Sequence, residues 1–245
     1  MAAFANSWQA PALLALFALW AALLFGGFIL GRPSADGGRR MPTWARMASS
    51  ATLVLIAWLE FALTRQTSVA GYALFIAAGM SLDFLGDLFL AGVIAIPQPV
   101  LGGIAAFGLG HVAYLLAIIR LADLYGLNAQ APRWGMLALW LLIGLVGWYA
   151  LVMRGQRPTM LHWAALPYAL LLAGVAGLFT GVALQSPALV PAALGAILFL
   201  VSDLILASQL FAKRMFPLIG DLIWLTYGPG QALIVASVAV VSLAF

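Results

Sequence analysis

The sequence has little charge. Asp, Glu, Lys and Arg make up only 7% of its 245 residues, against about 25% in an average soluble domain. Hydrophobic residues account for 65%, which leaves too few polar side chains to cover the surface of an ordinary soluble domain. The formal net charge of +4 comes from 11 Lys and Arg residues that lie between apolar segments and form no single patch. We therefore interpret the basic excess as a membrane-topology signal and expect no nucleic-acid partner.

Cysteine is absent and histidine is rare. The absence of cysteine excludes disulfide bonds, thiolate nucleophiles and cysteine-ligated metal sites. His111 and His162 are the two histidines, so a three-histidine zinc site is excluded as well. Chemistry must therefore come from carboxyl, hydroxyl, amide and imidazole groups, and we expect no metal and no cofactor.

Long apolar runs are abundant. Eight of them can be counted, which predicts an all-α fold, a polytopic bundle of eight transmembrane helices. The connections between them are too short for an extramembrane domain, so we expect residues 1–245 to form a single integral membrane domain. The expected helices are approximately residues 11–30, 47–63, 70–95, 99–119, 134–153, 162–184, 188–211 and 217–243.

The basic residues are divided unequally between the two sides of this bundle. The odd-numbered connections together carry eight Lys or Arg residues, and the even-numbered connections carry three. Because connections rich in Lys and Arg are retained in the cytoplasm, we expect the odd connections inside and both termini outside. We expect the membrane to be a bacterial inner (plasma) membrane.

Carboxyl groups occur within the expected spans. Asp83 and Asp87 are four residues apart in the third span, so they share one helix face. Asp203 lies in the seventh span and, like Asp87, is followed by Leu-x-Leu-Ala. An ionised carboxylate at bilayer depth costs on the order of 3 kcal/mol or more, and such residues usually face a polar cavity or a partner. Since no basic residue falls within an expected span, we interpret Asp87 and Asp203 as functional. Asp83 is either a third functional acid or a protonated residue bonded to a neighbouring helix.

The expected topology brings three acids into one half of the membrane. Asp87 and Asp203 fall in the cytoplasmic halves of their spans, and Asp221 lies about one turn into the eighth span. Glu60 and Asp123 fall near the opposite side, where we interpret them as interfacial, solvated charges. The offset of 116 residues between Asp87 and Asp203 suggests a parallel four-plus-four internal repeat.

Other polar residues lie in the fourth, seventh and eighth spans. His111 and Tyr114 are three residues apart on one helix face, and the repeat offset relates His111 to Tyr227. Gln231 continues the polar stripe of the eighth span, and Ser202 precedes the aspartate of the seventh. Such residues either hydrogen-bond neighbouring helices or contact a substrate, and both interpretations stay open at this point.

Two carboxyl groups that share a low-dielectric cleft tend to hold one proton between them. Such a pair suits acid-catalysed hydrolysis of an ether-like bond, in which one group delivers a proton and the other stabilises the developing cation or activates water. The same pair suits a proton-coupled transporter of small molecules or lipids. A third alternative is a lipid-binding membrane protein without catalytic activity.

Four short motifs lie in the third to eighth spans. They are Gly86-Asp87 with the Leu-x-Leu that follows, the segment Phe107 to Tyr114 with its Gly-His-x-x-Tyr core, Gly195-x-x-x-Phe199-x-x-Ser202-Asp203, and Tyr227-x-x-x-Gln231. In this order and in these spans they resemble the YhhN/TMEM86 family of lysoplasmalogenase-type integral membrane proteins.

The resemblance implies eight transmembrane helices and hydrolysis of the vinyl ether bond of lysoplasmalogens to a fatty aldehyde and a glycerophospho-base. It implies that Asp87 and Asp203 are catalytic, with a single-chain ether lysophospholipid as substrate and membrane lipids as surroundings. One departure is Asp83, where the family usually has a small polar residue. The supporting or substrate-binding candidates are Asp83, His111, Tyr114, Ser202, Asp221, Tyr227 and Gln231.

Overall fold

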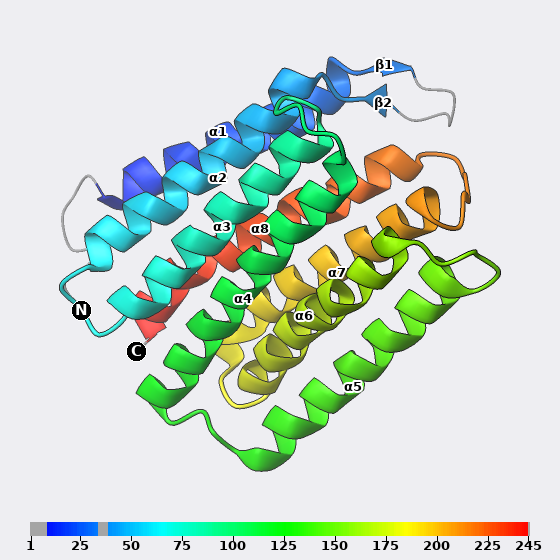
Figure 1. Cartoon of the computed structure of the whole chain (residues 1–245). Coiled ribbons are helices and arrows are strands. Elements are labelled where there is room, and N and C mark those ends of the chain that lie inside the picture. Colours follow the sequence, from blue (N-terminus) through cyan, green and yellow to red (C-terminus); the bar gives the residue numbers. More distant parts are fainter. Residues whose placement is uncertain (1–8, 34–38, 245) are drawn as a thin grey trace.

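The computed structural model describes residues 9–33 and 39–244 (Figure 1). The predicted spans are helical in it, because a helix lets a long apolar segment satisfy its backbone hydrogen bonds within a membrane. Within these residues, eight helices are long and apolar enough to cross a bilayer, so the protein is an integral membrane protein with the predicted all-α fold. They are α1 Gln9–Ile29, α2 Thr43–Thr64, α3 Ala70–Leu90, α4 Pro99–Tyr125, α5 Gln130–Trp148, α6 Met160–Ala183, α7 Val190–Leu210 and α8 Ile219–Ala244.

Four short elements accompany the long helices. A π-helical turn, η1 Tyr149–Met153, continues α5, and a 3-10 turn, η2 Pro187–Leu189, leads into α7. Strands β1 Arg32–Pro33 and β2 Arg39–Arg40 pair antiparallel in the connection from α1 to α2. Val152 of η1 lines an internal cavity, and π-helical turns are frequent at functional sites.

Four ends of the predicted spans differ by four residues or more. Helix α3 ends at Leu90, five residues early, and Gly92 then turns the chain with a φ of 70°. Helix α4 runs on to Tyr125, six residues beyond the predicted end. Helices α2 and α5 begin at Thr43 and Gln130, each four residues early. The early start of α2 places Arg46 within a membrane-spanning helix, so the prediction that no basic residue falls within a span is wrong.

The inner helices form a closed ring. In the order α2, α3, α4, α6, α7 and α8, each helix packs against the next, and α8 packs against α2. Helix α1 packs outside on α2, and α5 packs outside on α6 (Figure 1). The connections α1–α2, α3–α4, α5–α6 and α7–α8 lie at the end marked by the β-hairpin, here called the hairpin end. The first turn of α1 and the last turn of α8 lie at the opposite end. The assignment of the hairpin end to the cytoplasm stays a prediction.

The packing order has the symmetry of an internal repeat. Exchanging α1–α4 with α5–α8 maps α2–α3 onto α6–α7, α3–α4 onto α7–α8, and α4–α6 onto α8–α2, all of which are observed contacts. The offset of 116 residues also relates Gly79 of α3 to Gly195 of α7. A Cβ on Gly79 would lie 2.4 Å from the Tyr114 ring of α4, and one on Gly195 would lie 2.6 Å from the Gly230 carbonyl oxygen of α8. Glycine therefore allows consecutive helices to approach closely at equivalent places in the two halves.

Glu60 is buried, and the prediction of an interfacial, solvated charge is wrong for this residue. Its side chain is 0% exposed. It lies near Tyr72 of α3, whose hydroxyl is hydrogen-bonded to that of Ser237 in α8. The side chain at position 60 therefore faces the place where α2, α3 and α8 meet. The hydropathy of the sequence does not show whether a polar residue in a helix faces neighbouring helices or water. Asp123, by contrast, is exposed, although it lies in the last turn of α4 and not in a connection.

Candidate active site

A cavity of about 610 Å³ lies toward the hairpin end, and it is lined by the inner helices together with parts of α1, α5 and η1. Asp87 of α3 and Asp203 of α7 both line this cavity, together with Asp221 from the first turn of α8. The structure thus brings together the three acids that the predicted topology placed in one half of the membrane. Among the described residues, no group of three or more His, Asp or Glu side chains is arranged to hold a metal ion.

Asp87 is held by hydroxyl groups from two neighbouring helices. Its Oδ2 accepts a hydrogen bond of 2.6 Å from Ser50 of α2 and one of 3.0 Å from Tyr227 of α8. The side chain is 5% exposed and reaches the cavity. Two donors on one oxygen fix the orientation of the carboxyl group, as a catalytic group requires.

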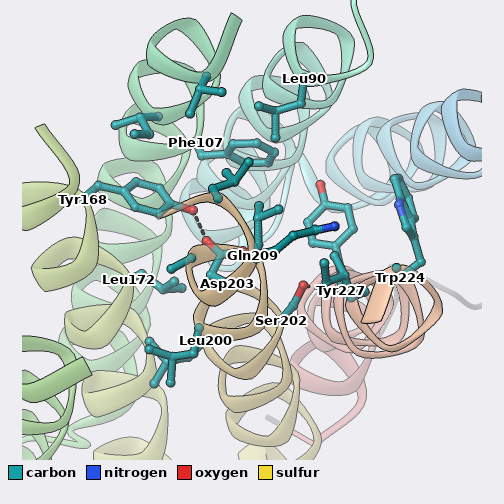
Figure 2. Close-up of a pocket in the computed structure, with 18 of the residues that line it drawn as sticks. Leu90, Phe107, Tyr168, Leu172, Leu200, Ser202, Asp203, Gln209, Trp224 and Tyr227 are labelled. Carbon is teal, nitrogen blue, oxygen red and sulfur yellow. Dashed lines mark hydrogen bonds between the residues drawn. The ribbon is translucent and has the colours of Figure 1, made fainter. Parts of the chain in front are cut away.

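Asp203 is held from the opposite side of the ring. Tyr168 of α6 donates a hydrogen bond to its Oδ2, and Figure 2 shows the two side chains meeting across adjacent helices, with Tyr227 on the far side of the cavity. Ser202 lines the cavity but donates a hydrogen bond of 3.0 Å to the Ile223 carbonyl, which joins α7 to α8. Each aspartate therefore accepts a hydrogen bond from a hydroxyl group on the preceding helix of its own half. For Asp87 the donor is Ser50 of α2, and for Asp203 it is Tyr168 of α6.

Asp83, Tyr114 and Gln231 form a second hydrogen-bonded cluster behind the cavity wall. Asp83 Oδ2 accepts bonds from the Tyr114 hydroxyl at 2.7 Å and from Gln231 Nε2 at 2.6 Å. All three side chains are 0% exposed, and none of the three lines the cavity. Gln231 Nε2 also lies 3.4 Å from the hydroxyl of Tyr227. The cluster therefore supports Tyr227, which is hydrogen-bonded to Asp87. Because Asp83 bonds residues of α4 and α8, its geometry favours a role in joining helices over a role in the cavity.

His111 also lies behind the wall. Its ring centroid is 4.9 Å from that of Phe199 and 5.4 Å from that of Tyr168, and the side chain is 0% exposed. Neither ring nitrogen has a hydrogen-bond partner in the described part of the chain. His111 does not line the cavity, so it contacts the site through Tyr168, the partner of Asp203.

The inner wall of the cavity is mostly apolar and continues toward the lipid-facing surface. Gly144 and Gly147 of α5 and Leu204 of α7 belong to this wall. Gly147 and Leu204 also line a shallow apolar groove on the outside of the bundle. A Cβ on Gly147 would lie 2.7 Å from Leu204 Cδ2. The side chain of Leu204 therefore stands between the interior of the cavity and the lipid.

Three residues of the site were not predicted: Ser50, Tyr168 and Arg46. Ser50 and Tyr168 each share their helix with other polar residues. Which of these residues face the cavity depends on the rotation of α2 and α6, and the sequence does not give that rotation. Arg46 was assigned to a connection, yet it lines the cavity. The sequence did contain one indication that Arg46 belongs to the site. Arg46 and Ser50 are four residues apart, so both lie on one face of the helix if the helix begins before Arg46.

A model of the YhhN family matches residues 41–238. This range contains the acid pair, the residues bonded to it and the buried cluster behind it. No curated protein and no solved structure matches the chain. Because the family model covers more than half of the sequence, the chain belongs to the YhhN family.

Proposed function

We propose that the protein is an intramembrane hydrolase that cleaves the vinyl ether bond of lysoplasmalogens, with Asp87 and Asp203 as its general acid and base. The observation that carries the proposal is the position of these two carboxyl groups, which come from equivalent helices and line one cavity. The motifs that resemble lysoplasmalogenase-type proteins support the same activity. The products are a fatty aldehyde and a glycerophospho-base.

Hydrolysis of a vinyl ether requires a proton donor and a group that stabilises positive charge. A protonated carboxyl group delivers its proton to the β-carbon, which gives an oxocarbenium ion. The ionised partner stabilises this cation and accepts a proton from the water that attacks it. The resulting hemiacetal then collapses as a proton passes from its hydroxyl group to the departing alcohol oxygen. Over the whole cycle one water is consumed, and the pair returns to one proton.

The cavity suits an amphiphile with one hydrocarbon chain. The polar groups that hold Asp87 and Asp203 lie toward the hairpin end, and the apolar wall extends to Gly147 and Leu204 beside the lipid. We expect the hydrocarbon chain to follow this wall and to leave between α5 and α7. The cytoplasmic half of a bacterial inner membrane is the expected location, because the hairpin end carries most of the basic residues.

A proton-coupled transporter of small molecules or lipids is the alternative that the same acids allow. Transporters of this kind often build their binding sites from discontinuous helices in both halves. Here α6 and α8 continue through Pro167 and Pro229, and the cavity lies toward one end of the bundle. Both features favour the hydrolase.

Aldehyde release by the purified protein in detergent tests the proposal. The substrates are a vinyl-ether lysophospholipid and its saturated alkyl-ether and acyl analogues, and aldehyde is expected from the vinyl ether alone. Asp87→Asn and Asp203→Asn should each lower the rate by about 10²- to 10⁴-fold, because each removes one member of the acid–base pair.

Asp123→Asn, which changes an exposed carboxyl group far from the cavity, is the matched control and should retain activity. An active Asp87→Asn or Asp203→Asn variant would contradict the assignment of the pair. Absence of aldehyde with folded wild-type protein would contradict the reaction itself, and proton-linked transport in proteoliposomes would then be measured.

A further inference from the structure

Arg46 places a positive charge beside the acid pair. It lies in the first turn of α2, is partly buried and lines the cavity. Its guanidinium carbon lies 5.6 Å from the centroid of the Trp224 ring of α8. Among the side chains that the structure describes, Arg46 is the one Lys or Arg in the cavity wall. The exposed residues Arg154, Arg157, Lys213 and Arg214 of the same end do not line it.

The position of Arg46 relative to Asp87 follows from α2. Arg46 precedes Ser50 by four residues, so both lie on one face of the helix, and Ser50 is hydrogen-bonded to Asp87. One helical turn rises about 5.4 Å, and α2 runs inward from the hairpin end. The guanidinium group is therefore attached about one turn closer to that end than the Ser50–Asp87 hydrogen bond. The cation is thus nearest the hairpin end, the carboxyl pair follows, and the apolar wall adjoins the pair at Leu204, the residue after Asp203.

A lysophospholipid carries its groups in the same order. Its phosphate is joined through the three carbon atoms of glycerol to the ether oxygen, and the hydrocarbon chain follows. The extended glycerol spans a length comparable with one helical turn. A phosphate near Arg46 would therefore place the ether bond beside Asp87 and the chain along the apolar wall.

We propose that Arg46, which lies over the ring of Trp224, binds the phosphate of the lipid headgroup and so positions the ether bond at the aspartate pair. The inference rests on the proposed hydrolase function, and it adds that the phosphate of the substrate is the group that the protein recognises. A guanidinium group binds phosphate through two parallel N–H donors, which a Lys ammonium group cannot reproduce. The face of the Trp224 ring favours the cation and restricts its position.

Two single-chain vinyl ethers test this assignment. One is the vinyl-ether lysophospholipid, and the other is the 1-alkenyl glycerol, which lacks the phosphate. In wild-type protein kcat/KM should favour the phosphate-bearing substrate. Arg46→Gln should reduce this preference by about ten- to a hundredfold, mainly through KM, because a charge-assisted interaction is lost. Arg46→Lys should recover only part of it. Arg154→Gln, which changes an exposed arginine at the same end, should leave the preference unchanged.

Binding without turnover separates this inference from the hydrolase proposal. The saturated alkyl-ether lysophospholipid and the corresponding alkyl glycerol are the probes, and Arg46→Gln should weaken binding of the first at least tenfold more than binding of the second. Equal weakening of both would overturn the phosphate site, whether or not the protein releases aldehyde. Competition by inorganic phosphate as strong as that by a glycerophospho-base would also overturn it, because the site would then serve a free anion.

Discussion

Replacement of Asp83 distinguishes a structural acid from a catalytic one. Asp83 is fully buried, bonded to Tyr114 and Gln231, and absent from the cavity wall. Asp83→Asn keeps the shape of the side chain and an oxygen that accepts both bonds. We therefore expect it to change the free energy of unfolding by less than about 1 kcal/mol and to leave aldehyde release within a fewfold of wild type.

Asp83→Leu removes the acceptor and leaves buried donors behind. An unpaired buried polar group costs about 1–3 kcal/mol, and two donors are affected. The Tyr114 hydroxyl has a second acceptor in Gln231 Oε1 at 3.2 Å, so most of the cost falls on the Gln231 amide. The expected loss is therefore about 2–3 kcal/mol, near the lower end of the two-donor range.

Thermal unfolding in detergent, measured beside aldehyde release, checks both variants. At 2–4 °C per kcal/mol, the Tm of Asp83→Leu should fall by roughly 4–12 °C, while that of Asp83→Asn stays close to wild type. An Asp83→Asn variant that is stable but inactive would refute the reasoning, because Asp83 would then take part in the chemistry. A Leu variant as stable as wild type would refute it as well.

Four further predictions concern packing, the acid pair, the buried glutamate and the hydrocarbon route. Gly195→Ala should destabilise the fold by about 1–3 kcal/mol, because the new Cβ meets the backbone of α8, whereas Gly135→Ala, with open space around it, should be neutral or stabilising by up to about 1 kcal/mol in the same unfolding assay. Tyr168→Phe removes the hydrogen bond to the second aspartate and should lower kcat about tenfold with little change in Tm, since a misplaced catalytic group costs rate; wild-type kcat would contradict this. Glu60→Gln should retain both Tm and aldehyde release, because it keeps the shape of a buried group far from the cavity; lost activity in a stable variant would show a longer-range role. Leu204→Trp should raise KM more for long-chain than for short-chain substrates, and a uniform rise would argue against a chain passing between α5 and α7.

The sequence was sufficient to predict the eight spans and the acid pair. An apolar run of about 20 residues has no stable alternative to a helix in a membrane, and a carboxyl group inside such a run is costly enough to indicate function. The meeting of Asp87 and Asp203 at one cavity was therefore predictable from helix direction, while their catalytic role stays a prediction.

The surroundings of the pair depend on helix rotation, which hydropathy does not report. Ser50 and Tyr168 look like ordinary polar residues until α2 and α6 are turned toward the cavity. Glu60 was misassigned for the same reason, since the face of α2 that carries it packs against other helices. Arg46 was misassigned because the helix begins before the apolar run does.

The symmetry of the packing order has a consequence for the surroundings of the two aspartates. The offset of 116 residues relates Asp87 to Asp203, but it pairs Asp83 with Phe199 and His111 with Tyr227. Tyr227 is hydrogen-bonded to Asp87, whereas His111 does not line the cavity. The two halves of the bundle therefore contribute unlike side chains to one cavity, and a chain with two identical halves would not reproduce it.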